Sequence, residues 1–353
     1  MSNYTVTTLR PEEFSEWRDF VGRSPDGCVY AEAQYLQALT EATGAQFRIL
    51  GVRRPEGLVG GVALYETYSR LQGRRAGPRL LLYYHGPILA AYDGTYPSQH
   101  TSRDLEIQTA LLGHLASLRY DSVTLKSRPT VRDVRAFVSR NWSASPAYTY
   151  VVSLCDLKQQ WQRVESNLRR LIKRCAETDG LTFTDDGDFD SFFRLHSLTL
   201  GRRRVPTYLP ELSFRRFVES ARAHGLARLQ HARLPSGTAI ASQLVLLGKH
   251  PVCHTACAGM DPEYGRLGAT AFLRWRGFEA LAALGYKAND LTDAALNSVT
   301  HFKSQLGGAL ESSVVLQSPT SARHRAAGRL QGALHVPRAT ASRLLRTLGR
   351  RPR

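Results

Sequence analysis

An internal repeat is the sequence feature that most narrows what this chain can fold into. Residues 52–64 and 232–244 both have the pattern of a strand, a tight turn with proline and glycine, and a second strand. Alternating apolar residues on each side of such a turn are typical of a β-hairpin. Gly57 and Gly237 supply the positive φ that the two corners need.

The elements that follow the two hairpins also recur in the same order. Residues 111–120 and 277–286 have the pattern of helix ends, and they lead into short strands at 122–125 and 288–291. A repeated order constrains architecture more than any single propensity does. The sequence therefore predicts two α+β units of the same kind, each of about 150 residues.

Length and composition agree with two folded units. The 353 residues are 42% hydrophobic and 22% charged, which excludes wholesale disorder and collagen-like sequence. We expect a first domain at 1–152, a second domain at 153–320 and a basic C-terminal tail at 321–353. No run approaches the ~20 apolar residues of a membrane span, and the N-terminus lacks a secretion-signal pattern, so we expect a cytoplasmic protein.

The charge is strongly positive and half of the excess lies in the predicted tail. The formal net charge is +17, and residues 321–353 contain nine arginines and no acidic residue. Leu344, Leu345 and Leu348 fall on one helical face beside arginines, a pattern that suits anionic lipid at the inner membrane face or RNA phosphates. A solvated tail without a partner is the simpler alternative.

The cysteines and histidines do not predict a metal site. The five cysteines include no C-x-x-C pair, which favours a reducing compartment over a disulfide framework. His250, Cys253, His254 and Cys257 lie on a predicted strand, where residues four apart are about 13 Å apart and cannot share one ion. The sequence also lacks the motifs of a nucleophile elbow, a Walker loop and a complete dinucleotide fingerprint.

Two helices are predicted between the repeats. Residues 157–177 form one continuous helical pattern, with apolar residues at Trp161, Val164, Leu168, Leu171 and Cys175 and with arginines and lysine on the other faces. The second helix spans 190–200 and is expected to bury Phe192, Phe193, Leu195 and Leu198. The segment 201–206, which contains three arginines, is predicted to be a loop.

The second half resembles the Fem-type (FemAB) peptidoglycan-bridge aminoacyltransferases. Residues 167–174 and Gly180 resemble the basic helix that opens the second domain of that family. The same order continues through residues 195–203, the hairpin at Gly237 and residues 301–308. The resemblance covers residues 156–316.

The resemblance implies both a fold and an activity. The fold is a tandem pair of acetyltransferase-like (GNAT) domains, each a mixed, mainly antiparallel sheet flanked by helices. The activity is transfer of an amino acid from aminoacyl-tRNA to the amine of a phosphate-bearing cell-wall or cell-envelope precursor, without a metal or a bound cofactor. Relatives that use acyl-coenzyme A instead make acyl-CoA the alternative co-substrate.

The candidate site residues follow from the chemistry of aminolysis, which needs a neutral amine and a stabilised oxyanion. Lys303, beside Phe302 and shortly before Gly307, is the candidate for oxyanion stabilisation, a role that the resemblance supports. Asp290 or Asp293, at the end of a predicted strand, is the candidate that accepts or positions the amine proton.

Phosphate binding is predicted at two further segments. Arg202, Arg203 and Arg204, followed by Tyr208, form the densest cationic loop, and guanidinium groups pair well with phosphates. Tyr264 opens a glycine-containing segment before a predicted helix, where an acetyltransferase would bind the pyrophosphate of coenzyme A.

Two alternatives to a Fem-type aminoacyltransferase remain open from the sequence. The first is a coenzyme A-dependent N-acyltransferase of the same fold. The second is a non-catalytic nucleic-acid-binding protein, which the positive charge and the arginine-rich tail favour.

Overall fold

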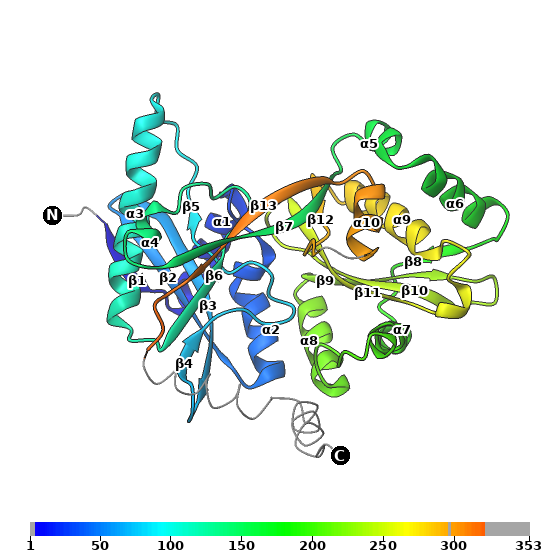
Figure 1. The fold of residues 1–353 in the computed structure, drawn as a ribbon, viewed down its shortest axis with the longest axis horizontal. Helices are drawn as coiled ribbons and strands as arrows, with labels where there is room; N and C mark the ends of the chain where they lie inside the picture. The colour runs from blue at the N-terminus through cyan, green and yellow to red at the C-terminus, as the bar shows by residue number, and fades with distance from the viewer. Residues whose placement is uncertain (1–3, 296–297, 322–353) are drawn as a thin grey trace, which may run out of the picture.

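The computed structural model describes residues 4–295 and 298–321, and it consists of two α+β halves that lie side by side (Figure 1). The strands of the first half are β1 (Thr5–Thr8), β2 (Gln46–Arg54), β3 (Gly57–Ser69), β4 (Gly73–Ala76), β5 (Ile88–Leu89) and β6 (Ser122–Lys126). Its helices are α1 (Phe14–Arg23), α2 (Ala33–Thr43), α3 (Pro97–Ser117) and α4 (Arg135–Val138).

The second half begins with a strand that leaves the first. Its strands are β7 (Ser143–Ser153), β8 (Thr182–Thr184), β9 (Ala227–Arg233), β10 (Ala239–Leu246), β11 (Val252–Met260), β12 (Ala288–Asp290) and β13 (Ala309–Gln317). Its helices are α5 (Leu157–Arg163), α6 (Ser166–Glu177), α7 (Phe189–Arg202), α8 (Glu211–Ala223), α9 (Ala269–Ala283) and α10 (Ser298–Gln305). In Figure 1, α6 and α9 lie on one side of β9–β11, and α7 and α8 lie on the other.

The predicted repeat is confirmed. The strands β2 and β3 form one antiparallel hairpin and β9 and β10 form the other. Gly57 and Gly237 have positive φ values of 128° and 87° at the two corners. In both halves the long helix after the hairpin, α3 or α9, leads into a short strand that pairs in parallel, β6 with β4 and β12 with β11.

Two long strands join the halves into one continuous sheet. β13 pairs antiparallel with β7 from Ala309↔Val151 to Gln317↔Ser143. The far end of β13 also pairs with β6, whereas the far end of β7 pairs with β12. The predicted boundary between residues 152 and 153 therefore falls inside β7, and the last strand of the described chain returns to the first half (Figure 1).

The prediction of one continuous helix at 157–177 is wrong. α5 ends at an extended Val164, and α6 begins at Ser166. The backbone N–H of Glu165 donates to the carbonyl of Gln305 (2.9 Å), and the Gln160 amide donates to the carbonyls of Leu306 and Gly307. Tertiary contacts with the turn after α10 thus replace the local helical hydrogen bonds at this corner.

The second predicted helix is confirmed and is slightly longer than expected. α7 continues through Arg202, so the loop predicted at 201–206 starts at residue 203. Phe192 and Leu195 are buried, but Leu198 is 39% exposed, which corrects its expected burial. The stripe that faces the sheet passes through Phe192, Leu195 and His196, and Leu198 lies beside that stripe.

A shared aromatic core holds the halves together. α2 packs against α8, with the rings of Tyr35 and Phe217 at 5.6 Å in an edge-to-face arrangement. The buried cluster that contains this pair draws residues from both halves. From the first half, the hydroxyl of Tyr84 donates to Asp290 (2.8 Å) and that of Tyr83 donates to the carbonyl of Ala256 (3.3 Å). The first half therefore contributes directly to the region around the end of β12.

No helix within residues 4–295 and 298–321 is long and apolar enough to cross a membrane. The predicted amphipathic segment with Leu344, Leu345 and Leu348 lies outside the described residues.

Candidate active site

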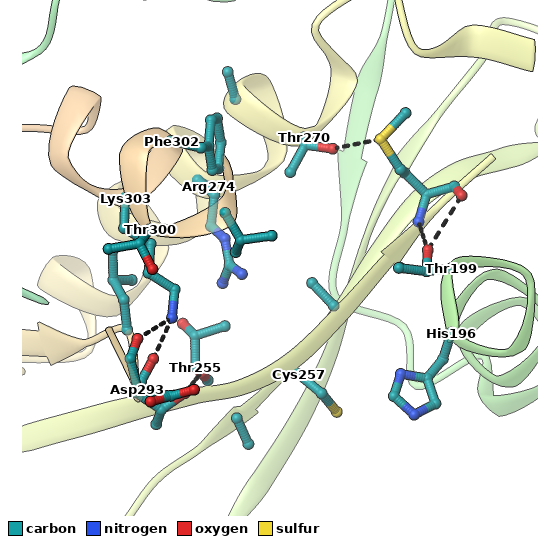
Figure 2. Close-up of a pocket in the computed structure, with 18 of the residues that line it drawn as sticks. His196, Thr199, Thr255, Cys257, Thr270, Arg274, Asp293, Thr300, Phe302 and Lys303 are labelled. Atoms are coloured by element: carbon teal, nitrogen blue, oxygen red, sulfur yellow. Dashed lines mark hydrogen bonds between the residues drawn. The ribbon is translucent and has the colours of Figure 1, made fainter. Parts of the chain in front are cut away.

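A cavity of about 490 Å³ opens in the second half, beyond the end of β12 (Figure 2). Its walls come from β11, the first turns of α9, α7, α10 and the turn at 291–293, and Tyr83 enters from the first half. Gly259 on β11 lets α7 approach closely, because a Cβ there would lie 2.3 Å from the backbone carbon of Leu195. This packing fixes the distance between two walls of the cavity.

Lys303 points into this cavity from α10 (Figure 2). Its ammonium group donates to the carbonyl oxygens of Thr292 and Asp293, the second at 2.6 Å. Burial, and after it the nearby charge of Arg274, lowers the pKa of Lys303 to about 8. A lysine in this state is still mostly charged at neutral pH and keeps one N–H for a substrate oxygen.

The turn that holds Lys303 has an unusual backbone. Thr292 and Asp293 have φ values of 50° and 49°, in the left-handed region that residues with a Cβ rarely adopt. The N–H of Thr292 donates to Asp290 (2.8 Å), and its hydroxyl donates to the carbonyl of Thr255 (2.9 Å). These bonds hold the two carbonyls in the orientation that grips the lysine.

Asp290 lies behind the cavity and is absent from its wall. Its carboxylate is 0% exposed and accepts hydrogen bonds from the hydroxyls of Tyr84 (2.8 Å) and Thr149 (2.5 Å) as well as from Thr292 N–H. Asp293, by contrast, is exposed and lines the cavity beside Lys303. Of the two acidic candidates, the structure therefore brings Asp293 to the cavity and uses Asp290 to support the turn.

The other predicted residues divide into two groups. The first group lines the cavity and consists of two pairs, Arg203 with Tyr208 and Phe302 with Lys303. About one hundred residues separate the two pairs in the sequence. Arg202 and Arg204 are exposed next to Arg203 but do not line the cavity, and Tyr264 lies outside it next to the lining residue Gly265.

Aromatic groups form a further part of the cavity wall. The rings of Tyr208 and His196 contact each other edge to face at 4.9 Å, and Tyr83, whose hydroxyl donates to the carbonyl of Ala256, also lines the cavity. Burial raises the pKa of both tyrosines and lowers the pKa of His196 to about 4. These three side chains are therefore uncharged at neutral pH.

Arg274 is a cavity residue that the sequence analysis missed. It projects from α9 toward the centre of the cavity (Figure 2) and is only 8% exposed. Its Nη1 has no hydrogen-bond partner, and burial lowers the pKa of its guanidinium to about 10. The available signal was a charged residue inside a nearly continuous run of apolar positions, with Phe272 and Phe278 on either side.

The start of α9 forms another part of the wall. Gly268, with φ 82°, precedes the helix, and it and Gly265 line the cavity. Arg174 on α6 donates to the carbonyls of Arg266 (3.1 Å) and Leu267 (3.2 Å), which fixes this segment against α6. The first N–H groups of α9 thus lie at the border of the cavity, where a helix favours an anion.

Within the described ranges no three histidine, cysteine or acidic side chains gather closely enough to hold a metal ion. Cys253, His254 and Cys257 are buried along β11, and the cysteines described are free thiols.

Comparisons with known proteins show what this fold and its second half resemble. Residues 162–304 match the family model described as an acetyltransferase (GNAT) domain. The solved structure of FemX has a TM-score of 0.71 at 11% identity, covering 88% of this chain and 96% of that one. No curated protein matches the sequence.

Two further solved structures have related folds. The C-terminal domain of an Agrobacterium fabrum protein named as a lysylphosphatidylglycerol synthetase has a TM-score of 0.56 at 12% identity, covering 89% of this chain and 95% of that one. A tandem GNAT protein from the clavulanic acid biosynthesis pathway has a TM-score of 0.51 at 12% identity, covering 90% and 100%. The expected tandem GNAT fold, its likeness to a Fem-type protein and the presence of an acyltransferase domain are confirmed.

Proposed function

We propose that this protein, whose second half is a GNAT acetyltransferase domain, transfers an aminoacyl group to an amine on a cell-envelope precursor. The observation that carries the proposal is the meeting of Lys303 and Phe302 with Arg203 and Tyr208 around one cavity. The lysine can stabilise the oxyanion that develops in amide formation, and the arginine can pair with a phosphate of the substrate.

The chemistry assigns a role to each group. The neutral amine attacks the carbonyl carbon of the ester, a C–N bond forms, and the C–O bond to the donor then breaks. Lys303 donates its remaining N–H to the oxyanion that develops on the carbonyl oxygen. Asp293, exposed at the cavity, accepts the amine proton, which finally passes to the leaving oxygen. Asp290 acts as a positioning residue through the turn that it supports.

Aminoacyl-tRNA is the donor that we propose. The exposed face of α6 carries Arg170, Lys173 and Arg174, while its apolar residues Leu168 and Leu171 line the cavity. A basic surface next to the cavity favours a long phosphate backbone, which binds in a salt-dependent way.

Acyl-coenzyme A is the alternative donor, and the start of α9 supports it. Gly265 and Gly268 let ligand phosphates approach the helix N-terminus at the cavity. Thermal unfolding separates the two donors. Stabilisation of the purified protein by acetyl-coenzyme A but not by charged tRNA would favour the coenzyme A-dependent activity.

The proposed acceptor is an amine on a phosphate-bearing precursor at the inner membrane face. Arg202, Arg203 and Arg204 support it, since guanidinium groups suit a diphosphate. The Agrobacterium fabrum domain of related fold belongs to a protein named for the synthesis of lysylphosphatidylglycerol, a membrane phospholipid. Contact with the membrane would use the tail outside the described residues.

The test is incubation with mixed aminoacyl-tRNAs and lipid-linked muramyl-pentapeptide, followed by mass spectrometry of the precursor. We expect one added aminoacyl residue. No added mass with any amino acid would count heavily against the proposal, and RNA binding that depends only on residues after Ser318 would favour a non-catalytic nucleic-acid-binding protein.

A further inference from the structure

Arg274 stands out because it is a buried cation without a described counter-ion. Its side chain is 8% exposed, and Nη1 has no hydrogen-bond partner. A buried guanidinium that loses water without gaining an acceptor is unfavourable, so such groups are retained where a ligand completes them. Figure 2 shows the guanidinium projecting from α9 into the cavity that also contains Lys303.

The charges around Arg274 point to an anionic ligand. Lys303 lies near enough for the two positive charges to lower the pKa of the lysine. The lysine ammonium donates to two backbone carbonyls, and the carboxylate of Asp290 is committed to three other donors. The carboxylate of Asp293, which also acts on the lysine, belongs to an exposed residue. A ligand anion at Arg274 would remove this repulsion and complete the guanidinium.

The number of free hydrogen-bond donors in the cavity indicates which kind of anion Arg274 binds. The hydroxyls of Thr255, Thr270 and Thr292 already donate to Asn289, Met260 and the carbonyl of Thr255. These threonine hydroxyls therefore add no donors beside Arg274, and the neighbouring Lys303 contributes its one remaining N–H. A dianionic phosphate needs more donors than this, whereas a carboxylate with a single charge pairs well with one guanidinium.

We propose that Arg274 binds a carboxylate on the part of the substrate that enters the cavity, so that the enzyme prefers substrates with this group. The carboxylate belongs either to the transferred acyl group or to the residue that bears the acceptor amine. The inference rests on the proposed acyl transfer for its effect on catalysis, but the binding of a carboxylate can be measured without any reaction.

The binding experiment uses the full chain, with glutarate as the probe. Its matched controls are glutaramide, which replaces the carboxylates by neutral amides, and inorganic phosphate. Titration calorimetry should detect glutarate binding to the unmodified protein and no binding of glutaramide. In R274M the affinity for glutarate should fall about 10- to 100-fold, the amount expected for one charged hydrogen-bonded pair.

Arg276 provides the matched control variant. It lies two residues further along α9, is half exposed and pairs with Glu279 (2.7 Å). R276M should leave the affinity for glutarate unchanged. R274K, which retains the charge without the forked donors, should bind glutarate with an intermediate affinity and tests the inference even if R274M does not fold.

Equal affinity of R274M and the unmodified protein for glutarate would overturn the inference. Glutaramide binding as tightly as glutarate, or phosphate binding without glutarate binding, would overturn it as well.

The transfer experiment distinguishes the source of the carboxylate. Glutamyl and glutaminyl donors are compared first, and then acceptors with a carboxylate or a carboxamide next to the amine. If R274M abolishes the preference for the glutamyl donor, the carboxylate belongs to the transferred group. If it abolishes the preference for the acceptor with a carboxylate, the carboxylate belongs to the acceptor. K303M should reduce transfer with every donor and acceptor. If no pair reacts while the Arg274-dependent binding of glutarate persists, the proposed function fails and the carboxylate site stands. If transfer occurs with no such preference, the carboxylate inference fails and the proposed function stands.

Discussion

The two halves share their order of elements but differ at the end of one strand. In the first half, the chain after β4 runs back beside the end of β6, where His85 N–H donates to the carbonyl of Lys126 (3.0 Å). Leu81, Tyr84 and His85 are buried there, and the small cavity beside Tyr84 and His85 has a volume of about 10 Å³. In the second half, the space beyond β12 is open and forms the cavity of about 490 Å³.

The difference shows that the two halves of a duplicated fold can have different roles. The filled copy contributes packing and two tyrosines, Tyr83 and Tyr84, to its neighbour. The open copy gathers Lys303, Arg274 and Arg203. The same supersecondary order can therefore support a reaction in one copy and stabilise the fold in the other, because function resides in the site and not in the fold.

The substitution K303M is the strongest test of the conclusion that the second half carries the reaction. Loss of the oxyanion donor should lower kcat for aminoacyl transfer about 10²- to 10³-fold. The unfolding midpoint should fall modestly, because the carbonyls of Thr292 and Asp293 lose their donor while the apolar stem remains. Steady-state kinetics with the mass-detected product measures the effect, and K158M, at an exposed lysine on α5, is the control. Equal activity of K303M and the unmodified protein would remove Lys303 from the mechanism.

The pH dependence should reveal the same lysine. Its pKa is lowered to about 8, so its positive charge is present below that pH and is lost as the pH rises through it. We expect kcat/KM to fall about tenfold for each pH unit above 8, as expected for a group that must be protonated. In K303R the falling limb should move upward by several pH units. If the fall of kcat/KM at high pH is unchanged in K303R, another group than Lys303 causes it.

D290N tests the support behind the cavity. The amide cannot accept all three hydrogen bonds that the carboxylate accepts, so one buried donor loses its partner. We expect the free energy of unfolding to fall by about 1–3 kcal/mol. We also expect kcat to fall about tenfold while KM changes little, because the turn that grips Lys303 loosens. Denaturant titration and kinetics measure the two effects. Loss of stability with full activity would separate Asp290 from the site.

Y84F tests the contribution of the first half. It removes the one hydroxyl that crosses to Asp290 while it keeps the ring and its packing. The expected loss is about 1 kcal/mol in the free energy of unfolding, the typical value for a single hydrogen bond. Y96F, at an exposed tyrosine, is the control for the substitution. A loss no larger than that of Y96F would mean that this bond does not stabilise the junction.

The sequence predicts best what depends on neighbouring residues. The hairpins at Gly57 and Gly237 were visible because turn chemistry and alternation are local. Lys303 and Phe302 were found through the family resemblance, which stands in for the missing spatial information. Arg203 and Tyr208 were singled out as a cationic loop, but only the structure places them at the same cavity as Lys303.

The sequence fails where distant segments decide the outcome. The break at Val164 depends on the carbonyls of residues 305–307, which no local pattern in 157–177 reveals. Arg274 was missed for a related reason. A helix that is apolar on nearly all sides gives no indication of which face borders a cavity, so the sequence does not show that its arginine at position 274 faces one.

The return of β13 to the first half has a consequence for the order in which the protein folds. β6 gains one of its neighbours only through residues 315–317. During synthesis the N-terminal half therefore keeps an unpaired strand edge until almost the whole described chain has left the ribosome. Its final cooperative step must wait for the C-terminal half, so the two copies mature together even though each has the order of elements of an independent domain.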